Sequence, residues 1–514
     1  MIALPLLLAG AVLGGDAPES YETLVARGLA RGKEGQLAEA RRSFDEAIAL
    51  DPARPEAWVE RGGLSFLEKE YVAAARDLRE ALDRRDDEYT RDLLASSLQL
   101  AGRGDEALAV WNPLGRPRLG TLDITGLVHT HDPLVRREIG IAEGDVVSLA
   151  RVREARLRLA ELGIFDRITV RPVPLGDGRA DLDVALIERY GLYRTPLDLG
   201  LNVGTNLLFK RLRPRFANVA GSGLTVGGQY RWEEHRPDLS VFMDWPRPLG
   251  LDATFHVGGF RGEQLYLAGD PLNKKAHGLD LSARHVFAGR FVGQIAFRTR
   301  DRTFSRPDPS APPGRIVGFE AGLDRRFLET SRQRLDASAR FFASGRPLGS
   351  DVSFERGMIG ASYKVTLGKP EGALLEKSLL ATQVHWGRGS DAMPIDEMFA
   401  PGGSPEMELP LRAHPQDDDG ALGATPIGRS LTLVNVEWRR RVVRTPFVQA
   451  GFVTFCDIGW VRRTASQSDL DHSFQDLGLG IRIGLGGTSV VRLDYAHGLS
   501  DGANAVFFGL NQVF

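Results

Sequence analysis

The chain has 514 residues, which at roughly 150 residues per domain suggests about three domains and excludes a single small one. Lys plus Arg number 65 and Asp plus Glu number 67, so the net charge of −2 offers no electrostatic argument for a nucleic-acid partner. The 59 glycines exceed average usage without a collagen-like period. The single cysteine, Cys456, excludes an intramolecular disulfide framework and a cysteine-rich zinc site.

An apolar run, residues 1–13, opens the chain and is followed by small and polar residues. It has the length of a signal-peptide core, although no Lys or Arg precedes it. We therefore predict a signal peptide over residues 1–17. A short buried helix fits less well, because the run has no polar face and contains Pro5. Nothing after this run approaches the roughly 18 consecutive apolar residues that a membrane-spanning helix needs.

The segment 18–115 repeats itself with an offset of 34 residues. Small residues recur at this spacing in three pairs: Gly28 and Gly62, Ala40 and Ala74, Ala47 and Ala81. A less complete third copy contains Ala95, Gly102, Ala107 and Trp111. The pattern resembles the tetratricopeptide repeat, in which small residues let paired antiparallel helices approach closely. Two hypotheses for the role of such a domain stay open: it is a rigid spacer, or it has a concave surface that docks a peptide or partner protein.

Residues 116–190 predict a small α+β domain. The expected order is a strand at 119–125, helices at 132–139 and 149–162, and strands at 165–172 and 180–188. With the step Gly163-Ile164-Phe165, this order resembles a polypeptide-transport-associated (POTRA) domain. The resemblance implies an exposed second strand that pairs with client strands, since unpaired N–H and C=O groups along an edge accept another extended chain. An adaptor domain without a client is the alternative.

The remaining segment, 195–514, alternates apolar and polar residues in many strands. Near its end, for example, Leu479, Ile481 and Ile483 alternate with Gly480 and Arg482. A soluble sandwich also alternates, but it seldom needs so many strands in one block. An outer-membrane β-barrel reverses the arrangement, with apolar residues toward lipid and charged residues toward a wet interior. We therefore predict an antiparallel transmembrane barrel whose first strand lies near 197–203 and whose last lies near 506–514. Three aromatic residues near strand ends suit its interfacial girdles: Tyr230, Trp232 and Trp438.

Three local features narrow the class of barrel. They are a terminal-strand signal in Gly509, Leu510 and Phe514, a strand motif in Phe455, Asp457 and Gly459, and the loop sequence Leu411-Arg412-Ala413-His414. Together they resemble the BamA/TamA-like bacterial surface antigen family of outer-membrane assembly barrels. The loop departs from that family's apolar-Arg-Gly-aromatic tip at Ala413 and His414. Because alanine resists backbone angles that glycine permits, the conformation of the tip stays an open question.

The resemblance implies a sixteen-strand barrel and an ion pair between Arg412 on the loop and Asp457 on the wall. An arginine carried into a lumen with low-dielectric walls needs a carboxylate partner, because an unpaired buried charge is costly. Strand alternation places Asp457 toward the lumen and Cys456 and Ile458 toward lipid. An ordinary extracellular-loop arginine is the alternative for Arg412.

We predict no enzyme, no cofactor and no metal site. The chain lacks a Gly-x-Ser-x-Gly elbow, a Gly-x-x-x-x-Gly-Lys loop and a His-Glu-x-x-His motif. His129 and His131, and the acidic run 417–419, are interpreted as solvated loops and not as metal ligands. A barrel enzyme that acts on lipids is also disfavoured, because the sequence shows no set of residues that could activate a nucleophile.

The resemblance implies a protein of the bacterial outer membrane that assembles, inserts or translocates other proteins. Its repeats and POTRA-like domain would capture client polypeptides in the periplasm and deliver them to a seam between the first and last strands. Expected partners are outer-membrane lipid, unfolded clients and accessory proteins, without nucleic acid. A passive pore or a dedicated protein-secretion channel is the alternative, and the single POTRA-like domain favours an accessory role.

Overall fold

The computed structural model describes residues 19–175, 178–189, 196–267, 270–330, 332–371, 373–403, 408–464, 472–485 and 489–510. The predicted signal peptide and Phe514 lie outside these ranges. The chain divides into two compact units, which we describe separately. One comprises Met1–Asp123, Ile141–Leu149 and Val170–Val184, and the other Ile124–Gly140, Ala150–Thr169 and Ala185–Phe514. No helix in the described ranges is long and apolar enough to cross a membrane.

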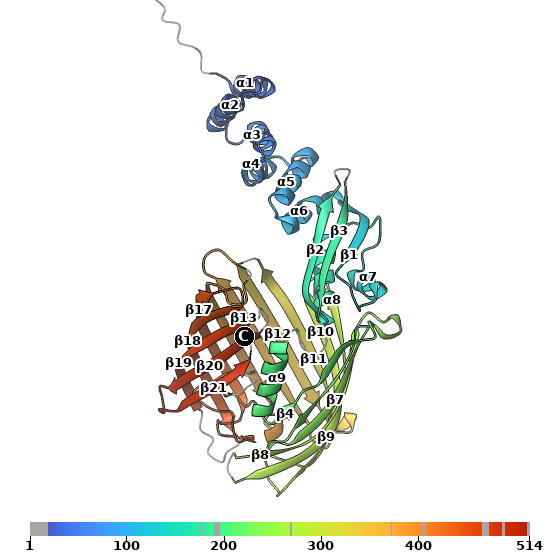
Figure 1. Cartoon of the computed structure of the whole chain (residues 1–514), viewed down its shortest axis with the longest axis vertical. Helices are drawn as coiled ribbons and strands as arrows, with labels where there is room; N and C mark the ends of the chain where they lie inside the picture. Colours follow the sequence, from blue (N-terminus) through green and yellow to red (C-terminus); the bar gives the residue numbers. More distant parts are fainter. Residues whose placement is uncertain are drawn as a thin grey trace, which may run out of the picture. The chain divides into compact units, whose positions relative to one another are not determined.

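Six helices begin the first unit (Figure 1): α1 Tyr21–Lys33, α2 Leu37–Leu50, α3 Glu56–Leu67, α4 Tyr71–Arg84, α5 Glu88–Leu100 and α6 Gly104–Trp111. They pack in successive pairs, and the glycines with the 34-residue offset lie where partners come closest. A Cβ on Gly28 would lie 2.5 Å from Phe44 Cε1, and one on Gly62 would lie 2.8 Å from Leu78 Cγ. The predicted helical pairs are confirmed, while their assignment as tetratricopeptide repeats stays a prediction.

The ends and buried faces of these helices follow from local sequence. Ser20 and Asp87 accept hydrogen bonds from the amides of Thr23 and Thr90 and so begin α1 and α5. Buried alanines and leucines of α4 and α5 form one core with Trp111 of α6. The pairs therefore stack through small residues, as the repeat pattern predicts.

The next elements appear in the predicted order: β1 Arg118–Thr125, α7 Asp132–Ile139, α8 Leu149–Glu161, β2 Phe165–Pro174 and β3 Arg179–Glu188. The strands form a sheet in the order β1-β3-β2, so the second strand lies at an edge. Helix α8 buries Val152, Ala155 and Leu159, which its sequence places on one face.

A closed barrel makes up most of the second unit (Figure 1), and its neighbouring long strands pair antiparallel. Its longer strands are β6 Leu224–Arg231, β7 Asp238–Pro246, β8 Thr254–Tyr266, β9 Leu272–Phe287, β10 Phe291–Phe304, β11 Gly314–Glu329, β12 Gln333–Ser344, β13 Phe354–Thr366, β14 Ser378–Gly389, β17 Gly428–Arg444, β18 Val448–Thr464, β19 His472–Leu485, β20 Ser489–Gly498 and β21 Asn504–Leu510. Its short segments are β4 Arg211–Leu212, β5 Arg215–Val219, β15 Asp417–Asp418 and β16 Ala421–Leu422.

The barrel type is confirmed, but the sixteen predicted strands do not match the observed segments one to one. The closed order contains 18 segments and returns from β21 to β4. Two of them, β4 and β5, both pair with β6, and β15 and β16 are two-residue pieces of one connection. The alternation of apolar and polar residues does not show where a strand is interrupted or where a loop forms a two-residue strand, so these segments could not be counted from the sequence.

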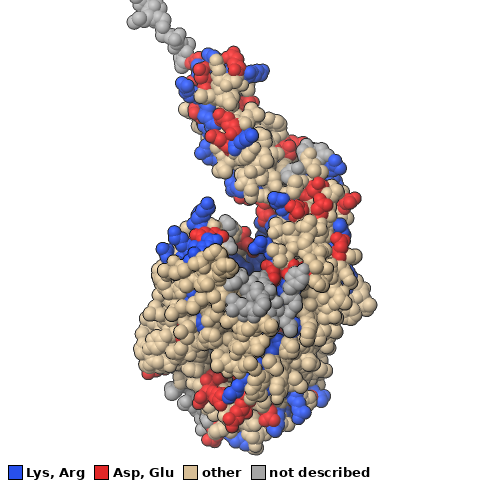
Figure 2. Space-filling model, in the orientation of Figure 1, with Lys and Arg blue, Asp and Glu red and all other residues tan. Residues whose placement is uncertain are grey.

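The barrel places apolar side chains outside and charged side chains inside. On β19, Leu477, Leu479 and Ile481 are 45 to 62% exposed, whereas Asp476 and Arg482 are buried. Figure 2 shows an outer wall largely without charged side chains, which gather toward the strand ends. A soluble sandwich buries its apolar set, so this reversal is what a lipid-facing wall requires.

The predicted first barrel strand near 197–203 is wrong, because this segment lies in helix α9, Pro196–Leu208. Its apolar residues alternate with period two, but Leu199, Val203 and Leu207 also recur at helical spacing. These three side chains are exposed on one side of α9. The first wall segments are instead β4 and β5, and the last is β21, which covers part of the predicted terminal strand.

Candidate functional site in the barrel lumen

The connection between β14 and β17, residues 390–427, is called the lumen loop below. Its described part contains the short helix η4 Ile395–Glu397 together with β15 and β16. Leu411, Arg412 and Ala413 are completely buried. Apolar residues of the loop form one core with inward-facing residues of the wall such as Leu431 and Leu433. The loop thus fills part of the barrel interior.

Arg412 binds Asp457 of β18 through three hydrogen bonds. Its Nη2 lies 2.6 Å from Asp457 Oδ1, its Nε lies 2.7 Å from Oδ2, and its backbone amide donates to Oδ2 at 3.1 Å. Its Nη1 donates to Glu437 of β17, and its guanidinium carbon lies 3.5 Å from the centre of the Phe455 ring. The structure brings together the two residues expected to pair and adds Glu437, which the sequence analysis missed.

The charges around Arg412 are balanced and hydrogen-bonded. Arg439 donates to the second oxygen of Glu437 at 2.7 Å, so two arginines face two carboxylates. Asn435 donates to Asp457 Oδ1 at 2.8 Å and to the Pro410 carbonyl at 2.7 Å, which holds the loop backbone against the wall. Because the side chains of Arg412, Glu437 and Asp457 are inaccessible to solvent, removal of one charge would leave the others uncompensated.

The motif residues Phe455, Asp457 and Gly459 occupy one face of β18. Phe455 and Asp457 are buried toward the lumen, while Cys456 between them is more exposed. A Cβ on Gly459 would lie 3.3 Å from Leu411 Cδ1, so glycine at this position leaves room for the loop. The three motif positions therefore supply an aromatic face, a carboxylate and space, all to the same loop tip.

The loop tip tolerates alanine where the family has glycine. Ala413 is not among the non-glycine residues with positive φ, so its backbone conformation is open to any side chain. Its amide donates to Asp476 Oδ2 on β19 at 2.7 Å. Alanine in place of glycine at position 413 is thus compatible with a loop tip that is hydrogen-bonded to the barrel wall.

A second ionic anchor holds the other arm of the lumen loop. Asp396 of η4 lies 2.6 Å from Arg302 Nη1 on β10 and 3.4 Å from Lys274 Nζ on β9, and both Asp396 and Arg302 are almost inaccessible. Next to it, Glu397 pairs with Arg356 of β13 at 3.0 Å. The sequence analysis missed this anchor, because no local motif links residues that are 94 positions apart.

The predicted terminal-strand signal is described in part. Gly509 and Leu510 belong to β21, and Phe514 lies outside the described residues. A Cβ on Gly509 would lie 2.7 Å from Arg492 Nη2 of β20, so a larger residue would displace this lumen arginine. The role of these residues as a signal stays a prediction.

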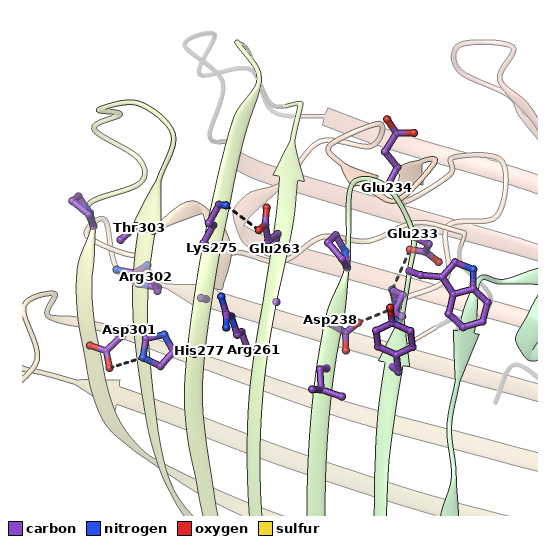
Figure 3. A pocket seen from close by; sticks show the side chains of 18 of the residues that line it. Glu233, Glu234, Asp238, Arg261, Glu263, Lys275, His277, Asp301, Arg302 and Thr303 are labelled. Carbon is purple, nitrogen blue, oxygen red and sulfur yellow. Dashed lines mark hydrogen bonds and ion pairs between the residues drawn. The ribbon is translucent and has the colours of Figure 1, made fainter.

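A separate pocket of about 1350 Å³ lies at one end of β6 to β10 (Figure 3). Several of its charged side chains pair across neighbouring strands: Lys275 with Glu263 at 3.0 Å, His277 with Asp301 at 3.8 Å and Arg231 with Asp238 at 3.1 Å. Tyr230 and Trp232 at its side are exposed, as an interfacial girdle requires. The pocket therefore has the composition of a membrane-interface rim.

The other residues considered as ligands, His129 and the acidic run 417–419, have protein partners in the structure. The amide of His129 donates to Glu188 at 2.9 Å and its ring is exposed. In the acidic run, Asp419 pairs with Lys210 at 3.2 Å. Across the part of the chain that the structure describes, no group of three or more His, Cys, Asp or Glu side chains could hold a metal ion.

Comparison with known proteins agrees with this architecture. Residues 117–189 match the POTRA family model, described as surface antigen variable number repeat. CdiB from Escherichia coli aligns with a TM-score of 0.54 and 12% identity over 77% of this chain and 76% of that one. CdiB from Acinetobacter baumannii aligns with a TM-score of 0.51 and 13% identity over 87% and 86%. BamA from Haemophilus ducreyi lacking POTRA domains 1–3 aligns with a TM-score of 0.45 and 12% identity over 76% and 83%. No protein with a curated description matches the chain.

The fold and the reversed polarity define a transmembrane β-barrel preceded by a POTRA domain. Residues 117–189 thus form a POTRA domain, and the chain shares its fold with the two CdiB structures.

Proposed function

We propose that the protein inserts client polypeptides into the outer membrane, or moves them across it, through a conformational change of its barrel. The observation that carries the proposal is the fastened lumen loop. Buried ionic anchors at Arg412 and Asp396 hold the loop inside the barrel. A polypeptide that enters a barrel filled in this way needs either a displaced loop or an opening in the wall.

Among the described residues, the wall strands on either side of the seam between β21 and β4 are short. Strand β21 has seven described residues, β4 has two and β5 has five, whereas β17 and β18 have 17 each. A ladder with few paired residues separates at lower cost, and its free N–H and C=O groups can accept a client strand. Such work requires no covalent chemistry, so we propose no enzymatic activity and no cofactor.

The domains before the barrel supply surfaces for capturing clients. Strand β2 lies at an edge of the POTRA sheet, which suits pairing with an extended segment. The paired helices of residues 18–115, as tetratricopeptide repeats, would dock a client or an accessory protein. The predicted signal peptide would direct the chain to export, and the Arg412 and Asp457 pair would position the loop during client transfer.

A dedicated secretion channel is the second candidate, and one observation favours it. A polar cavity of about 520 Å³ lies beside the lumen loop, with charged walls that include Lys274, Asp280 and Arg300. A water-filled route of this kind suits a chain that crosses the lumen. This function differs from insertion, because a channel conducts ions whether or not clients enter the bilayer.

Client insertion into liposomes tests the proposal, with the wild type and Arg412→Ala reconstituted at equal amounts. Insertion by the wild type and its loss in R412A are expected. The matched control is Arg261→Ala, which removes an exposed arginine of β8. Unchanged insertion by an R412A barrel of normal stability would remove the ion pair from the mechanism. Ion conductance in planar bilayers without any insertion would favour the secretion channel.

A further inference from the structure

The tip of the lumen loop is tied to the terminal hairpin, which consists of β20, its turn and β21. His414 Nε2 lies 2.8 Å from Asp501 Oδ2 in that turn, and His414 Nδ1 lies 3.0 Å from Asp476 Oδ1 on β19. The ring of Phe474 packs edge-on against the imidazole, with 4.5 Å between centroids. The histidine is thus held between carboxylates from two elements of the wall.

A second contact fastens the loop to β21 itself. A Cβ on Gly403 would lie 2.1 Å from Phe507 Cζ, so the loop backbone lies directly against this ring. The Gly403 amide donates to the carbonyl of His414 at 2.8 Å. The loop tip therefore contacts both the turn and the last strand of the terminal hairpin.

The two anchors of the tip differ in their chemistry. A neutral imidazole has one N–H donor and can serve only one of two carboxylates, whereas the imidazolium has two donors. The guanidinium of Arg412 keeps its charge at every physiological pH. The link from Arg412 to β17 and β18 is therefore permanent, while the link from His414 to the hairpin depends on one proton.

We propose that His414 is a pH-sensitive latch that couples the lumen loop to the terminal hairpin and so to the β21–β4 seam. When the imidazolium releases its proton to water, one carboxylate loses its hydrogen-bond donor. The tie between the loop tip and the hairpin is then weakened, while Arg412 keeps the loop in the lumen. The consequence for clients rests on the proposed function, but the latch itself does not.

The direction of the pH dependence follows from the groups around the ring. These are Asp476 and its register partner Asp457 on the wall, Asp501 in the turn, Arg412 on the loop and His472, which stacks on Phe474. Burial lowers the pKa of His414, but the hydrogen bonds to Asp476 and Asp501 outweigh it and the pKa is raised. The hydrogen bond from His414 lowers the pKa of Asp501.

A raised histidine pKa means that the latch is fully formed below the ordinary histidine value and is lost as the pH rises through the raised value. At the acid end, the latch is lost as the pH falls through the lowered pKa of Asp501. The latch is therefore closed between these two limits and opens as the pH rises through the raised pKa of His414.

Hydrogen exchange of the β21 amides, Asn504–Leu510, measured on the full-length protein in vesicles from a pH below the ordinary histidine value to alkaline pH, tests the latch. At a pH below the ordinary histidine value, His414→Gln should raise exchange about fivefold over the wild type, as loss of roughly 1 kcal/mol implies. This difference should vanish at alkaline pH, where the wild type has also lost its proton. His414→Arg, a permanent cation, should keep β21 protected throughout. The matched control, His472→Gln, should behave as the wild type does.

Equal exchange in the wild type and H414Q at a pH below the ordinary histidine value would overturn the proposal, as would a difference that stays constant with pH. H414R behaving like H414Q would also overturn it. If H414Q fails to form a barrel with heat-modifiable electrophoretic mobility, Asp501→Asn removes the partner from the half-exposed side and carries the same expectations. No client is needed for this readout, so a failed insertion assay would contradict the proposed function and leave the latch standing.

Discussion

Arg302 on the barrel wall pairs with Asp396 of the lumen loop at 2.6 Å, and this pair has the opposite polarity to Arg412 with Asp457. At one arm the loop supplies the carboxylate and the wall supplies the cation, and at the other arm the roles are exchanged. Both pairs are almost inaccessible to solvent. Because each arm is fastened to different strands, displacement of the whole loop requires both pairs to break.

Asp396→Asn should therefore loosen one arm of the loop. The substitution leaves Arg302 and Lys274 without their carboxylate, and loss of one partner of a buried pair costs about 3–5 kcal/mol. We expect a higher and noisier conductance in planar bilayers, together with a lower unfolding temperature. Glu355→Gln, which removes an equal charge at an exposed position of β13, is the control. Conductance of D396N that matches this control would contradict the second anchor.

Arg412→Ala should destabilise the barrel more than substitution of an exposed loop arginine would. Asp457 and Glu437 stay buried after the cation is lost, so we expect a loss of about 3–5 kcal/mol. Adding Asp457→Asn to R412A should restore part of this loss, because the orphaned charge is removed. Urea unfolding in detergent measures both effects. A double variant as unstable as the sum of the two single variants would contradict the pairing energy.

The site could be predicted from sequence only where local motifs carry it. The strand motif at Phe455, Asp457 and Gly459 and the arginine of the loop are each readable within a few residues, and the geometry places Arg412 on Asp457. Glu437 and Asp396 belong to no such motif. Their partners are set by strand register and by the path of a long loop, which no pattern of neighbouring residues specifies.

The fold could be predicted where one hydrophobic period dominates. Helix α8 shows a single apolar face, and β19 alternates without interruption, so both were predictable. The segment of α9 satisfies both periods, since Leu199 and Val203 are two positions of an alternating set and also one helical turn apart. The local pattern of apolar residues is therefore compatible with both a strand and a helix, and the tertiary contacts of the segment determine which one forms.

Leu479→Arg tests the reversed polarity of the wall. Leu479 lies in the middle of β19 and is 62% exposed on the outer face, so the substitution should place a charge against lipid. A cost of about 2–4 kcal/mol is expected near the bilayer midplane. Equilibrium unfolding in vesicles measures this cost. Leu499→Arg, in the turn after β20, exchanges an equally apolar residue outside the strands and should cost little. Equal costs for both variants would argue against a lipid-facing β19.

Glu188 should make the POTRA domain sensitive to acid. Burial disfavours its charged form, but bonds from Thr130 and from the backbone amides of His129 and Val128 outweigh this and lower its pKa to about 2. A lowered pKa stabilises the fold above the ordinary value of 4.5, and this contribution is lost as the pH falls toward 2. The span corresponds to about 3 kcal/mol.

Hydrogen exchange of the backbone amides of Val128, His129 and Thr130, measured in the full-length protein, checks this expectation. Glu188→Gln should increase their exchange at neutral pH, and the difference from the wild type should shrink as the pH approaches 2. Glu143→Gln, at an exposed position of the same domain, should change nothing. A difference between E188Q and the wild type that persists unchanged at acid pH would show that the charge of Glu188 does not hold the segment.

Two adjacent glycines of α3 test the close packing of the helical pairs. A Cβ on Gly62 would lie 2.8 Å from Leu78 Cγ, a branch point that cannot move without its whole side chain, so Gly62→Ala should destabilise the pair by about 1–3 kcal/mol. A Cβ on Gly63, one position along, would meet open space, with no neighbouring atom within 4 Å. Gly63→Ala should therefore stabilise the helix by about 1 kcal/mol through its better helix propensity. Thermal unfolding followed by far-ultraviolet circular dichroism gives both signs, and two shifts of the same sign would contradict the register of α3 on α4.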